Sequence, residues 1–157
     1  MTKTEPPRTG RQRRADTLAK LEAVDADTWV ATASTTGVAH LVPLSYAWDG
    51  ECVVLSAEAS SVTVRNIRSS GRAGLGFGPT RDVVIVDGEL HRLVDVSDDG
   101  AKDIADAYEE QAAWDPRHDP EPYVFVLLRP RRVQAWREAN ELSGRVLMRN
   151  GEWLFSV

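Results

Sequence analysis

Three Asx-Gly dipeptides constrain the fold of this chain more than any other feature of its sequence. They are Asp49-Gly50, Asp87-Gly88 and Asn150-Gly151, and each stands between two runs of strand-forming residues. Asx-Gly is the strongest short-range signal of a tight β-hairpin, because both residues tolerate the positive φ angles that the turn requires. A chain that turns back on itself repeatedly in this way is expected to build an antiparallel sheet.

Runs rich in β-branched and aromatic residues place the strands between these turns. We expect strands at residues 28–34, 38–48, 51–56, 73–77, 81–86, 89–96 and 123–128, the last extended by 133–136, and a final hairpin at 144–148 and 152–155. The pattern predicts helices at 16–24, 60–72 and 97–114 and a proline-rich loop at 115–122. The fold class is therefore mainly β (α+β), an antiparallel barrel or roll of about six strands with flanking helices.

Length, charge and cysteine content limit the possible protein classes. The 157 residues suit one domain, and the net charge of -5 argues against a nucleic-acid-binding protein. The single cysteine, Cys52, excludes an internal disulfide and fits a cytoplasmic protein. No apolar run approaches the length of a membrane span. Residues 1–14 are polar and basic, so we expect a disordered tail before a domain at 15–157.

The segment 60–72 combines features that suit a bound anion. It begins with serines, and Arg65, Arg68 and Arg72 follow at helical spacing. The unpaired N–H groups and the positive dipole end of a helix start attract anions, and guanidinium groups add charge-assisted contacts. Hydroxyls are also ordinary helix caps, and arginines also suit the negative end of the helix dipole. The residues alone leave both interpretations open.

Two strands carry residues at which another molecule could approach the sheet. Pro43 cannot donate a ladder hydrogen bond, which indicates a bulge, an edge, or a place where a ligand replaces a neighbouring strand. Gly74, Gly76 and Gly78 alternate along a strand. They either let a flat ligand or another backbone come close, or mark a bend at a barrel corner.

Few groups are available for acid–base or metal chemistry. The histidines His40, His91 and His118 are far apart and lack the spacing of metal ligands. No nucleophile motif and no lysine-bearing phosphate loop is present. We therefore assign no catalytic side chain and no metal. A bound redox cofactor would carry any reaction, and the protein would position it.

Five short segments occur in an order that is typical of one family. They are residues 31–34, 37–44, 48–50, 61–68 and 71–73. This order resembles the pyridoxamine 5'-phosphate oxidase-like superfamily of split-barrel proteins, which bind FMN or a deazaflavin. The resemblance implies a split β-barrel homodimer with two cofactor sites at the subunit interface. Each site would hold FMN or the deazaflavin coenzyme F-420, and the second protomer would close it.

The same resemblance implies which residues meet the cofactor. The strand around residues 40–45 would run beside the ring, and the segment 56–66 would hold the phosphate. The implied cofactor-binding residues are His40, Val42, Pro43, Leu44, Ser56, Ser61, Thr63, Arg65, Asn66, Arg81 and Trp153. Trp136 and Met148 are further candidates for closing the site from the second protomer.

The chain departs from the family pattern at two places. Many members carry Arg-Lys where this chain has Val62-Thr63, so Thr63 and Arg65, with Arg81, would compensate. The C-terminal Arg-x-His pattern is absent, which argues against oxidation of pyridoxamine phosphate itself. The sequence predicts a flavin- or deazaflavin-dependent oxidoreductase that transfers hydride to or from a small organic substrate. A cofactor- or haem-binding barrel without turnover is the alternative.

Overall fold

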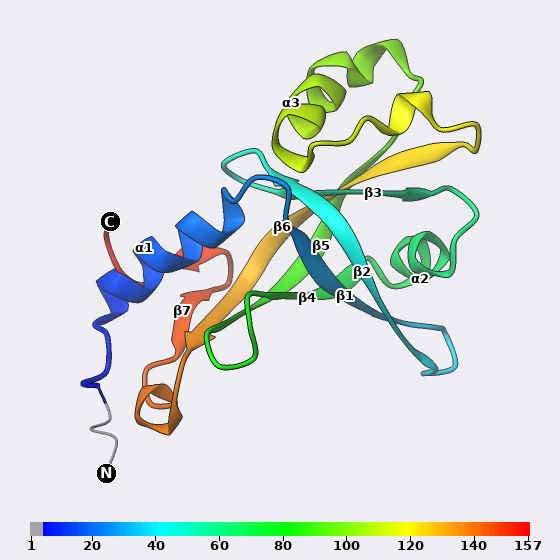
Figure 1. Ribbon diagram of the computed structural model, residues 1–157. Helices are drawn as coiled ribbons and strands as arrows, with labels where there is room; N and C mark the ends of the chain where they lie inside the picture. Colours follow the sequence, from blue (N-terminus) through cyan, green and yellow to red (C-terminus); the bar gives the residue numbers. More distant parts are fainter. Residues whose placement is uncertain (1–4) are drawn as a thin grey trace.

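The repeated hairpins build one antiparallel sheet that closes on itself. The computed structural model describes residues 5–157 (Figure 1). Its strands are β1 (Asp27–Ala33), β2 (Ala39–Trp48), β3 (Val53–Glu58), β4 (Arg72–Phe77), β5 (Val83–Asp95), β6 (Tyr123–Trp136), β7 (Val146–Arg149) and β8 (Glu152–Trp153). The strand order is β3-β2-β1-β4-β5-β6-β7-β8, and a further pairing of β3 with β6 closes six strands into a barrel. The expected barrel of about six strands in an α+β fold is confirmed.

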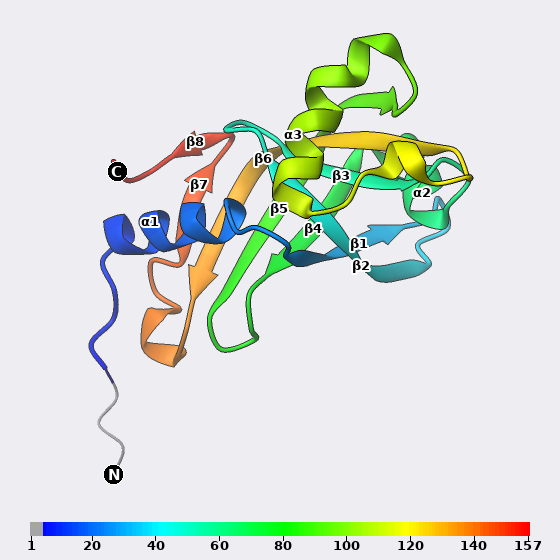
Figure 2. The same cartoon turned by 45° about the horizontal axis from the view of Figure 1, so that its top comes forward.

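The helices lie outside the barrel. They are α1 (Gly10–Leu21), α2 (Val62–Ser70) and α3 (Lys102–Ala112), with the short 3-10 turns η1 (Asp99–Ala101), η2 (Pro116–His118) and η3 (Ala139–Glu141). Figures 1 and 2 place α1 beside β7 and α3 across the opposite end, near β3. Within residues 5–157, no helix is both long and apolar enough to cross a bilayer.

Strand β2 opens the barrel along half of its length. It pairs with β1 from Ala39 to Ser45, but it pairs with β3 only from Tyr46 to Trp48. Beyond that point β3 continues along β6 alone, up to the pair of Glu58 with Tyr123. The first half of β2 is therefore an edge, which explains how Pro43 is tolerated there. This split between β2 and β3 positions the candidate site.

Two apolar cores hold the elements in place. Alternate residues of the strands fill the barrel, where Val30, Leu55 and Leu75 have at most 1% of their surface exposed. The second core lies under α3, where the fully buried Tyr108 packs on Phe125 with ring centroids 5.4 Å apart. Both faces of the β3–β6 region are thus buried.

Two of the three Asx-Gly turns are confirmed. Gly50 has φ +97° in the β2–β3 hairpin, and Asn150 and Gly151 have φ +53° and +80° between β7 and β8.

The predicted turn at Asp87-Gly88 is wrong, because both residues lie inside the single long strand β5. The register with β6 shifts between Asp87 and Gly88, as at a β-bulge. A Cβ at Gly88 would lie 3.1 Å from the Leu128 Cβ, so this glycine serves the close approach of β6 rather than a turn.

The N-terminal helix begins earlier than predicted. The sequence indicated a helix at 16–24 after a disordered tail, whereas α1 runs from Gly10 to Leu21. Thr9 caps it in a reciprocal capping box with Gln12, and the buried Arg13 donates to the carbonyl oxygens of Ala135 and Glu141. Long-range polar contacts therefore order a segment that has too few apolar residues to be found by periodicity. The part of the tail prediction that concerns residues 1–4 lies outside the described residues.

Candidate functional site

A hollow of about 560 Å³ lies at the split of the barrel. One wall is the edge of β2, another is the end of β3, and the start of α2 closes it. It brings together seven residues of the predicted site, namely His40, Val42, Pro43, Leu44, Ser56, Ser61 and Thr63. These residues come from segments that are distant in the sequence, so the split itself assembles them.

The start of α2 presents hydrogen-bond donors to this hollow. Ser61 is the N-cap, and its Oγ accepts from the backbone N–H of Val64 at 3.2 Å. The N–H groups of Val62 and Thr63 belong to the first turn and have no carbonyl partner inside the helix. The positive end of the helix dipole adds to their effect. This end of the hollow therefore suits an anion.

A buried hydroxyl next to the helix has no partner. Ser56 lies at the end of β3 with 3% of its surface exposed, and its Oγ makes no hydrogen bond within residues 5–157. An unsatisfied buried polar group costs about 1–3 kcal/mol, so such groups are rare in folded proteins. Because Ser56 lines the hollow, a ligand with an acceptor or donor group at this point would satisfy it.

The side-chain charges in the hollow do not favour an anion. Asp27 and Glu58 line it, and the Asp27 Oδ1 accepts from the Ser45 hydroxyl at 3.1 Å. No Lys or Arg is among its lining residues in the described part of the chain. Arg65 is exposed on α2, and its guanidinium has no ion-pair partner among residues 5–157. Backbone dipoles and hydroxyls must therefore provide the attraction within one chain.

Two aromatic side chains form a wall that the sequence did not single out. Trp114 and Tyr123 line the hollow, with ring centroids 5.3 Å apart in an edge-to-face arrangement. Desolvation raises the pKa of the Tyr123 hydroxyl, with Asp119 and Glu58 adding to the shift. Tyr123 reaches the site because β6 pairs with β3 along the split, up to the pair of Tyr123 with Glu58 at the end of β3. That contact between distant strands has no local sequence signal.

The remaining predicted residues lie outside this hollow. Asn66 is buried and donates from Nδ2 to the Thr32 hydroxyl at 3.0 Å. Arg81 pairs with Glu138, and Trp153 lies under the Arg14 guanidinium at 4.8 Å. Trp136 stacks with Arg145, and Met148 is buried. Within one chain, these residues are not brought to the start of α2.

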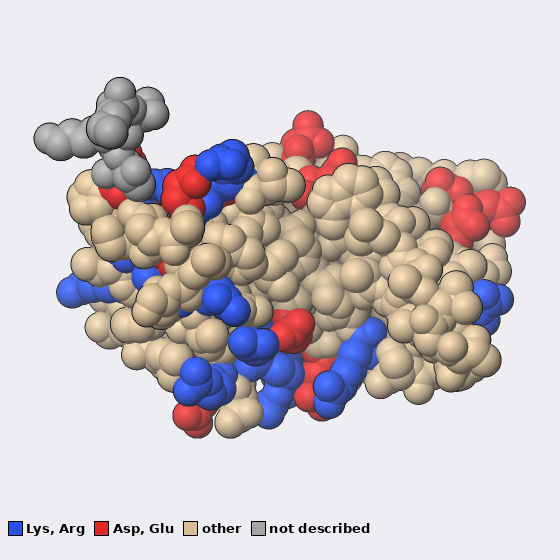
Figure 3. Space-filling model, turned by 90° about the horizontal axis from the view of Figure 1, so that it is seen from below, with Lys and Arg blue, Asp and Glu red and all other residues tan. Residues whose placement is uncertain are grey.

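A second hollow, of about 710 Å³, lies on the outer face of the barrel and shares no lining residue with the first. We call it the arginine groove. Arg72, Arg131, Arg132 and Arg149 line it together with Asp87 and Glu89. Seen from below, basic side chains gather along one edge of the molecule with acidic ones between them (Figure 3).

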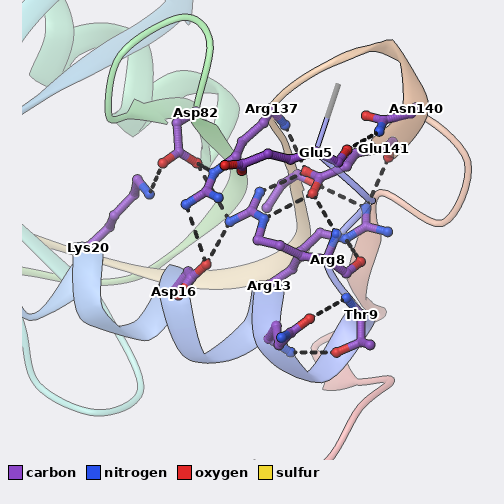
Figure 4. Close-up of polar contacts among 12 residues, drawn as sticks. Glu5, Arg8, Thr9, Arg13, Asp16, Lys20, Asp82, Arg137, Asn140 and Glu141 are labelled. Carbon is purple, nitrogen blue, oxygen red and sulfur yellow. Dashed lines mark hydrogen bonds and ion pairs between the residues drawn. The ribbon is translucent and has the colours of Figure 1, made fainter. Parts of the chain in front are cut away.

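A third charged region, which we call the ionic cluster, joins the N-terminal segment to the end of β6 (Figure 4). The Arg8 guanidinium donates to both carboxylate oxygens of Glu141, at 3.0 and 2.8 Å, and to Asp16 at 2.8 Å. Asp82 pairs with Lys20 at 3.3 Å and with Arg137 at 3.3 Å. Glu141 is 3% exposed, and the Arg8 hydrogen bond lowers its pKa to about 2.

The comparisons with known proteins agree with this architecture. The sequence matches the family model of pyridoxamine 5'-phosphate oxidase over residues 28–137. No curated protein matches it. Solved structures with a similar fold include an F420 reductase at 20% identity, covering 73% of this chain and 93% of that one, with a TM-score of 0.58.

Two further structures show that this fold occurs in proteins with different names. A heme-binding protein from Mycobacterium smegmatis is 19% identical, with 94% of this chain and 60% of that one covered and a TM-score of 0.65. General stress protein 26 from Bacillus anthracis is 12% identical, with 80% and 94% covered and a TM-score of 0.56. At these identities the likeness concerns the fold alone. The family model, which spans more than half of the sequence, shows that the chain belongs to the pyridoxamine 5'-phosphate oxidase family.

Proposed function

We propose that this chain is an oxidoreductase that binds FMN or coenzyme F-420 in the hollow at the split of the barrel. The observation that carries the proposal is the meeting of the unpartnered Ser56 hydroxyl with the start of α2 in one hollow. Membership of the family and the similar fold of an F420 reductase support the cofactor class. The cofactor would transfer the hydride, and the chain would bind and orient it.

The residues present fit a phosphate-bearing tricyclic group. The N–H groups of Val62 and Thr63, with the hydroxyls of Ser56 and Ser61, would hold the phosphate. The edge of β2 around Pro43 would lie along the ring, on the side where β3 does not pair with it. The aromatic wall would exclude water from one side of the ring.

We further propose that the chain works as a homodimer through the outer face of β1, β2 and β4. Trp29 stands opposite Pro43 and Gly76, and Ala31 stands opposite Leu41 and Gly74. Trp29 is 54% exposed and Leu41 is 61% exposed. Contiguous apolar surface of this kind marks an association site, and Pro43 belongs both to it and to the rim of the cofactor hollow.

Titration of the purified, cofactor-free chain with FMN and with F-420 tests the cofactor. We expect one of them to bind at micromolar concentration, measured by quenching of its fluorescence. Ser56→Ala should weaken binding severalfold without loss of stability, because it removes a hydroxyl that no protein group satisfies. Ser69→Ala is the control, since Ser69 lies at the far end of the same helix and bonds to the Arg65 carbonyl. Failure of both cofactors to bind would remove the proposal.

Val62→Arg tests the proposed position of the phosphate by a variant that should strengthen binding, whereas Ser56→Ala should weaken it. Val62 lines the hollow at the start of α2 and is 37% exposed, so a longer side chain has room to reach solvent. A guanidinium here restores half of the basic pair of other members and should tighten binding of the preferred cofactor about tenfold. Unchanged affinity would place the phosphate elsewhere.

The dimer has its own test. Leu41→Glu puts a charge in the centre of the apolar face and should give a monomer in sedimentation experiments, whereas the wild-type chain should sediment as a dimer. Val24→Glu is the matched control, because Val24 is 66% exposed in the loop after α1. A wild-type monomer would contradict the proposed interface.

Binding of haem without turnover is the second candidate, because His40 lines the hollow and imidazole is a common haem ligand. One solved structure of similar fold is a heme-binding protein. This candidate predicts a Soret band on addition of haem that His40→Ala abolishes. Binding of FMN or F-420 with oxidation of the reduced cofactor by an acceptor would exclude it.

A further inference from the structure

The hollow at the split carries negative charge that no side chain balances within residues 5–157. Glu58 lines it at the end of β3, and Asp27 lines it beside β2, as the cross-strand partner of Ser45. Neither carboxylate makes an ion pair in this part of the chain. The segment 97–123, which supplies the aromatic wall, adds nine carboxylates against one lysine and one arginine. Negative charge gathered around a hollow raises the local concentration of cations.

The tyrosines around this end of the hollow reflect the negative charge. Burial raises the pKa of the Tyr108 hydroxyl, and the charge of Asp27 adds to the shift. Burial also raises the pKa of Tyr123, with Asp119 and Glu58 adding to it. A nearby carboxylate raises the pKa of a tyrosine because it opposes the formation of a second negative charge. The shifts agree with the lack of a neutralising cation beside these carboxylates.

The aromatic wall also has no cation of its own. In the described part of the chain, the guanidinium groups that lie over tryptophan rings cover Trp136 and Trp153, and none covers Trp114 or Tyr123. Tyr123 stands directly opposite Glu58 in the pairing of β6 with β3, so the ring and the carboxylate border the same space. The face of an aromatic ring attracts positive charge, and its carbon atoms contact apolar substituents. A ring beside a carboxylate therefore suits an ammonium group that carries apolar groups.

A buried hydroxyl gives an independent indication that this hollow holds a ligand. Ser56 lies two residues before Glu58 on β3, so both side chains point to the same face of the strand. Ser56 is 3% exposed, and its Oγ has no hydrogen-bond partner within residues 5–157. Because buried polar groups are nearly always paired, the hollow differs from an ordinary acidic surface.

We propose that the end of the hollow formed by Glu58, Trp114 and Tyr123, with Asp27 across the split, binds the substrate, and that this substrate is an organic cation with an apolar body. This end is called the cation end below. The inference rests on the proposed function, because it leaves the start of α2 to the cofactor. The carboxylates would balance the positive charge, and the two rings would contact the apolar groups around it.

The cation end agrees with the proposed dimer. Glu58, Trp114 and Tyr123 lie on β3, after α3 and on β6, and none belongs to the face of β1, β2 and β4 that is proposed for association. An anionic substrate would meet two unpaired carboxylates here, so the arrangement selects for positive charge.

Calorimetric titration with benzyltrimethylammonium tests the proposal, with benzyl alcohol and phenylacetate as the neutral and anionic comparisons at matched ionic strength. The full chain is titrated as purified and again after removal of any cofactor. We expect saturable binding of the cation at one site per chain. The neutral and anionic compounds should bind at least about tenfold more weakly, since they lack the charge that the carboxylates and rings attract.

Glu58→Gln should weaken binding of the cation about fivefold, because it removes the charge and keeps the shape of the side chain. Trp114→Leu should weaken it at least about threefold, because it removes the ring and keeps an apolar side chain. Glu110→Gln is the matched control for charge, since Glu110 is exposed on α3 and does not line the hollow. It should change the affinity by less than about twofold. Circular dichroism melting curves check that each variant is folded.

Equal losses in Glu58→Gln and Glu110→Gln would overturn the proposal, because the attraction would then be a general effect of charge. Equal affinity for benzyl alcohol, or no saturable binding of the cation, would overturn it as well. The outcome is separate from that of the cofactor titrations. A chain that binds FMN or F-420 but not the cation keeps the proposed function and loses this inference, whereas a chain that binds the cation but neither cofactor keeps the cation site alone.

Discussion

The ionic cluster and the arginine groove are both rich in arginine, but they pair their charges differently. In the ionic cluster three cations, Arg8, Arg137 and Lys20, meet three carboxylates at short range. In the groove four arginines meet two carboxylates, and the one ion pair among its lining residues, described within 5–157, joins Arg131 and Glu89 at 3.5 Å. Both regions belong to the same domain and contain several arginines, so their residue composition does not distinguish them; the pairing of their charges does.

The difference teaches how to distinguish arginines that stabilise the fold from arginines that remain unpaired at the surface. Arg8 has a side chain that is 10% exposed and ties the N-terminal segment to the turn η3. Its charge is neutralised by Asp16 and Glu141, and removing one of these carboxylates would leave the buried guanidinium without a full counter-charge. Arg132 and Arg149 are exposed and unpaired in the described chain, so their removal should scarcely affect the fold. The free energy of unfolding should therefore respond to Arg8 and not to Arg132 or Arg149.

Glu141→Gln should produce the largest loss of stability. It keeps the shape of the side chain but removes the charge that holds Arg8, and breaking a buried pair costs about 3–5 kcal/mol. The free energy of unfolding in urea measures the loss. Glu138→Gln is the matched control, because the Arg81–Glu138 pair is exposed and should contribute less than about 1 kcal/mol. Equal effects of the two variants would mean that the ionic cluster is not a structural tie.

Acid should weaken the wild-type chain through the same carboxylate. Since the pKa of Glu141 falls from 4.5 to about 2 on folding, the unfolded state binds more protons between these values. The contribution of Glu141 is complete above pH 4.5 and is lost as the pH falls to about 2, which amounts to about 3 kcal/mol. Urea unfolding across this range should show a shallower pH dependence for Glu141→Gln than for the wild type.

Gly10→Ala should lower the free energy of unfolding by a smaller amount, at the contact of α1 with the C-terminal segment. A Cβ at Gly10 would overlap the ring of Phe155, so α1 or the C-terminal segment must shift. Overpacking of this kind costs about 1–2 kcal/mol where the neighbour is half-buried and can move. Gly100→Ala, where the nearest atom is 3.6 Å away, should leave the unfolding free energy unchanged. A neutral Gly10→Ala would show that the two termini are not docked together.

Arg149→Gln should have the smallest effect on stability and so gives the sharpest contrast with Glu141→Gln. Surface substitutions without a partner change the free energy of unfolding by less than about 0.5 kcal/mol. Any change at low salt should be an increase, because the substitution relieves repulsion with Arg132. A fall of more than about 1 kcal/mol in the free energy of unfolding in urea would show that Arg149 stabilises the fold. It would contradict the distinction between the paired Arg8 and the unpaired groove arginines.

The sequence predicted most of the barrel because local signals specify most of it. Two Asx-Gly turns and the serine-capped helix α2 formed where the pattern placed them. Asp87-Gly88 has the same local signal, but the approach of Leu128 from β6 turns it into a bulge within one strand. Only the partner strand distinguishes these outcomes. The start of α1 did carry a readable sign, the Thr9-x-x-Gln12 capping box.

The candidate site could be predicted where it is built from consecutive residues. The edge of β2 and the start of α2 are such segments, and their residues meet in the hollow. Trp114 and Tyr123 were missed, because Tyr123 reaches the hollow through the pairing of β6 with β3, and Trp114 through the packing of the end of α3 on the second core. The partner of Arg81 was missed for a similar reason, since Arg81 and Glu138 meet only because the start of β5 pairs with the end of β6. Which tryptophan faces the hollow depends on the topology and not on local spacing.

The pairing of β3 with β6 also has a consequence for how the chain reaches this structure. Strand β3 can pair with β6 only after residues 123–128 have left the ribosome, when most of the chain has been synthesised. Until then β3 leaves one edge open, and the apolar interior of the half-formed barrel is exposed to solvent. Such late ring closure between distant segments slows folding. The rate of translation around β6 should therefore influence the yield of native protein.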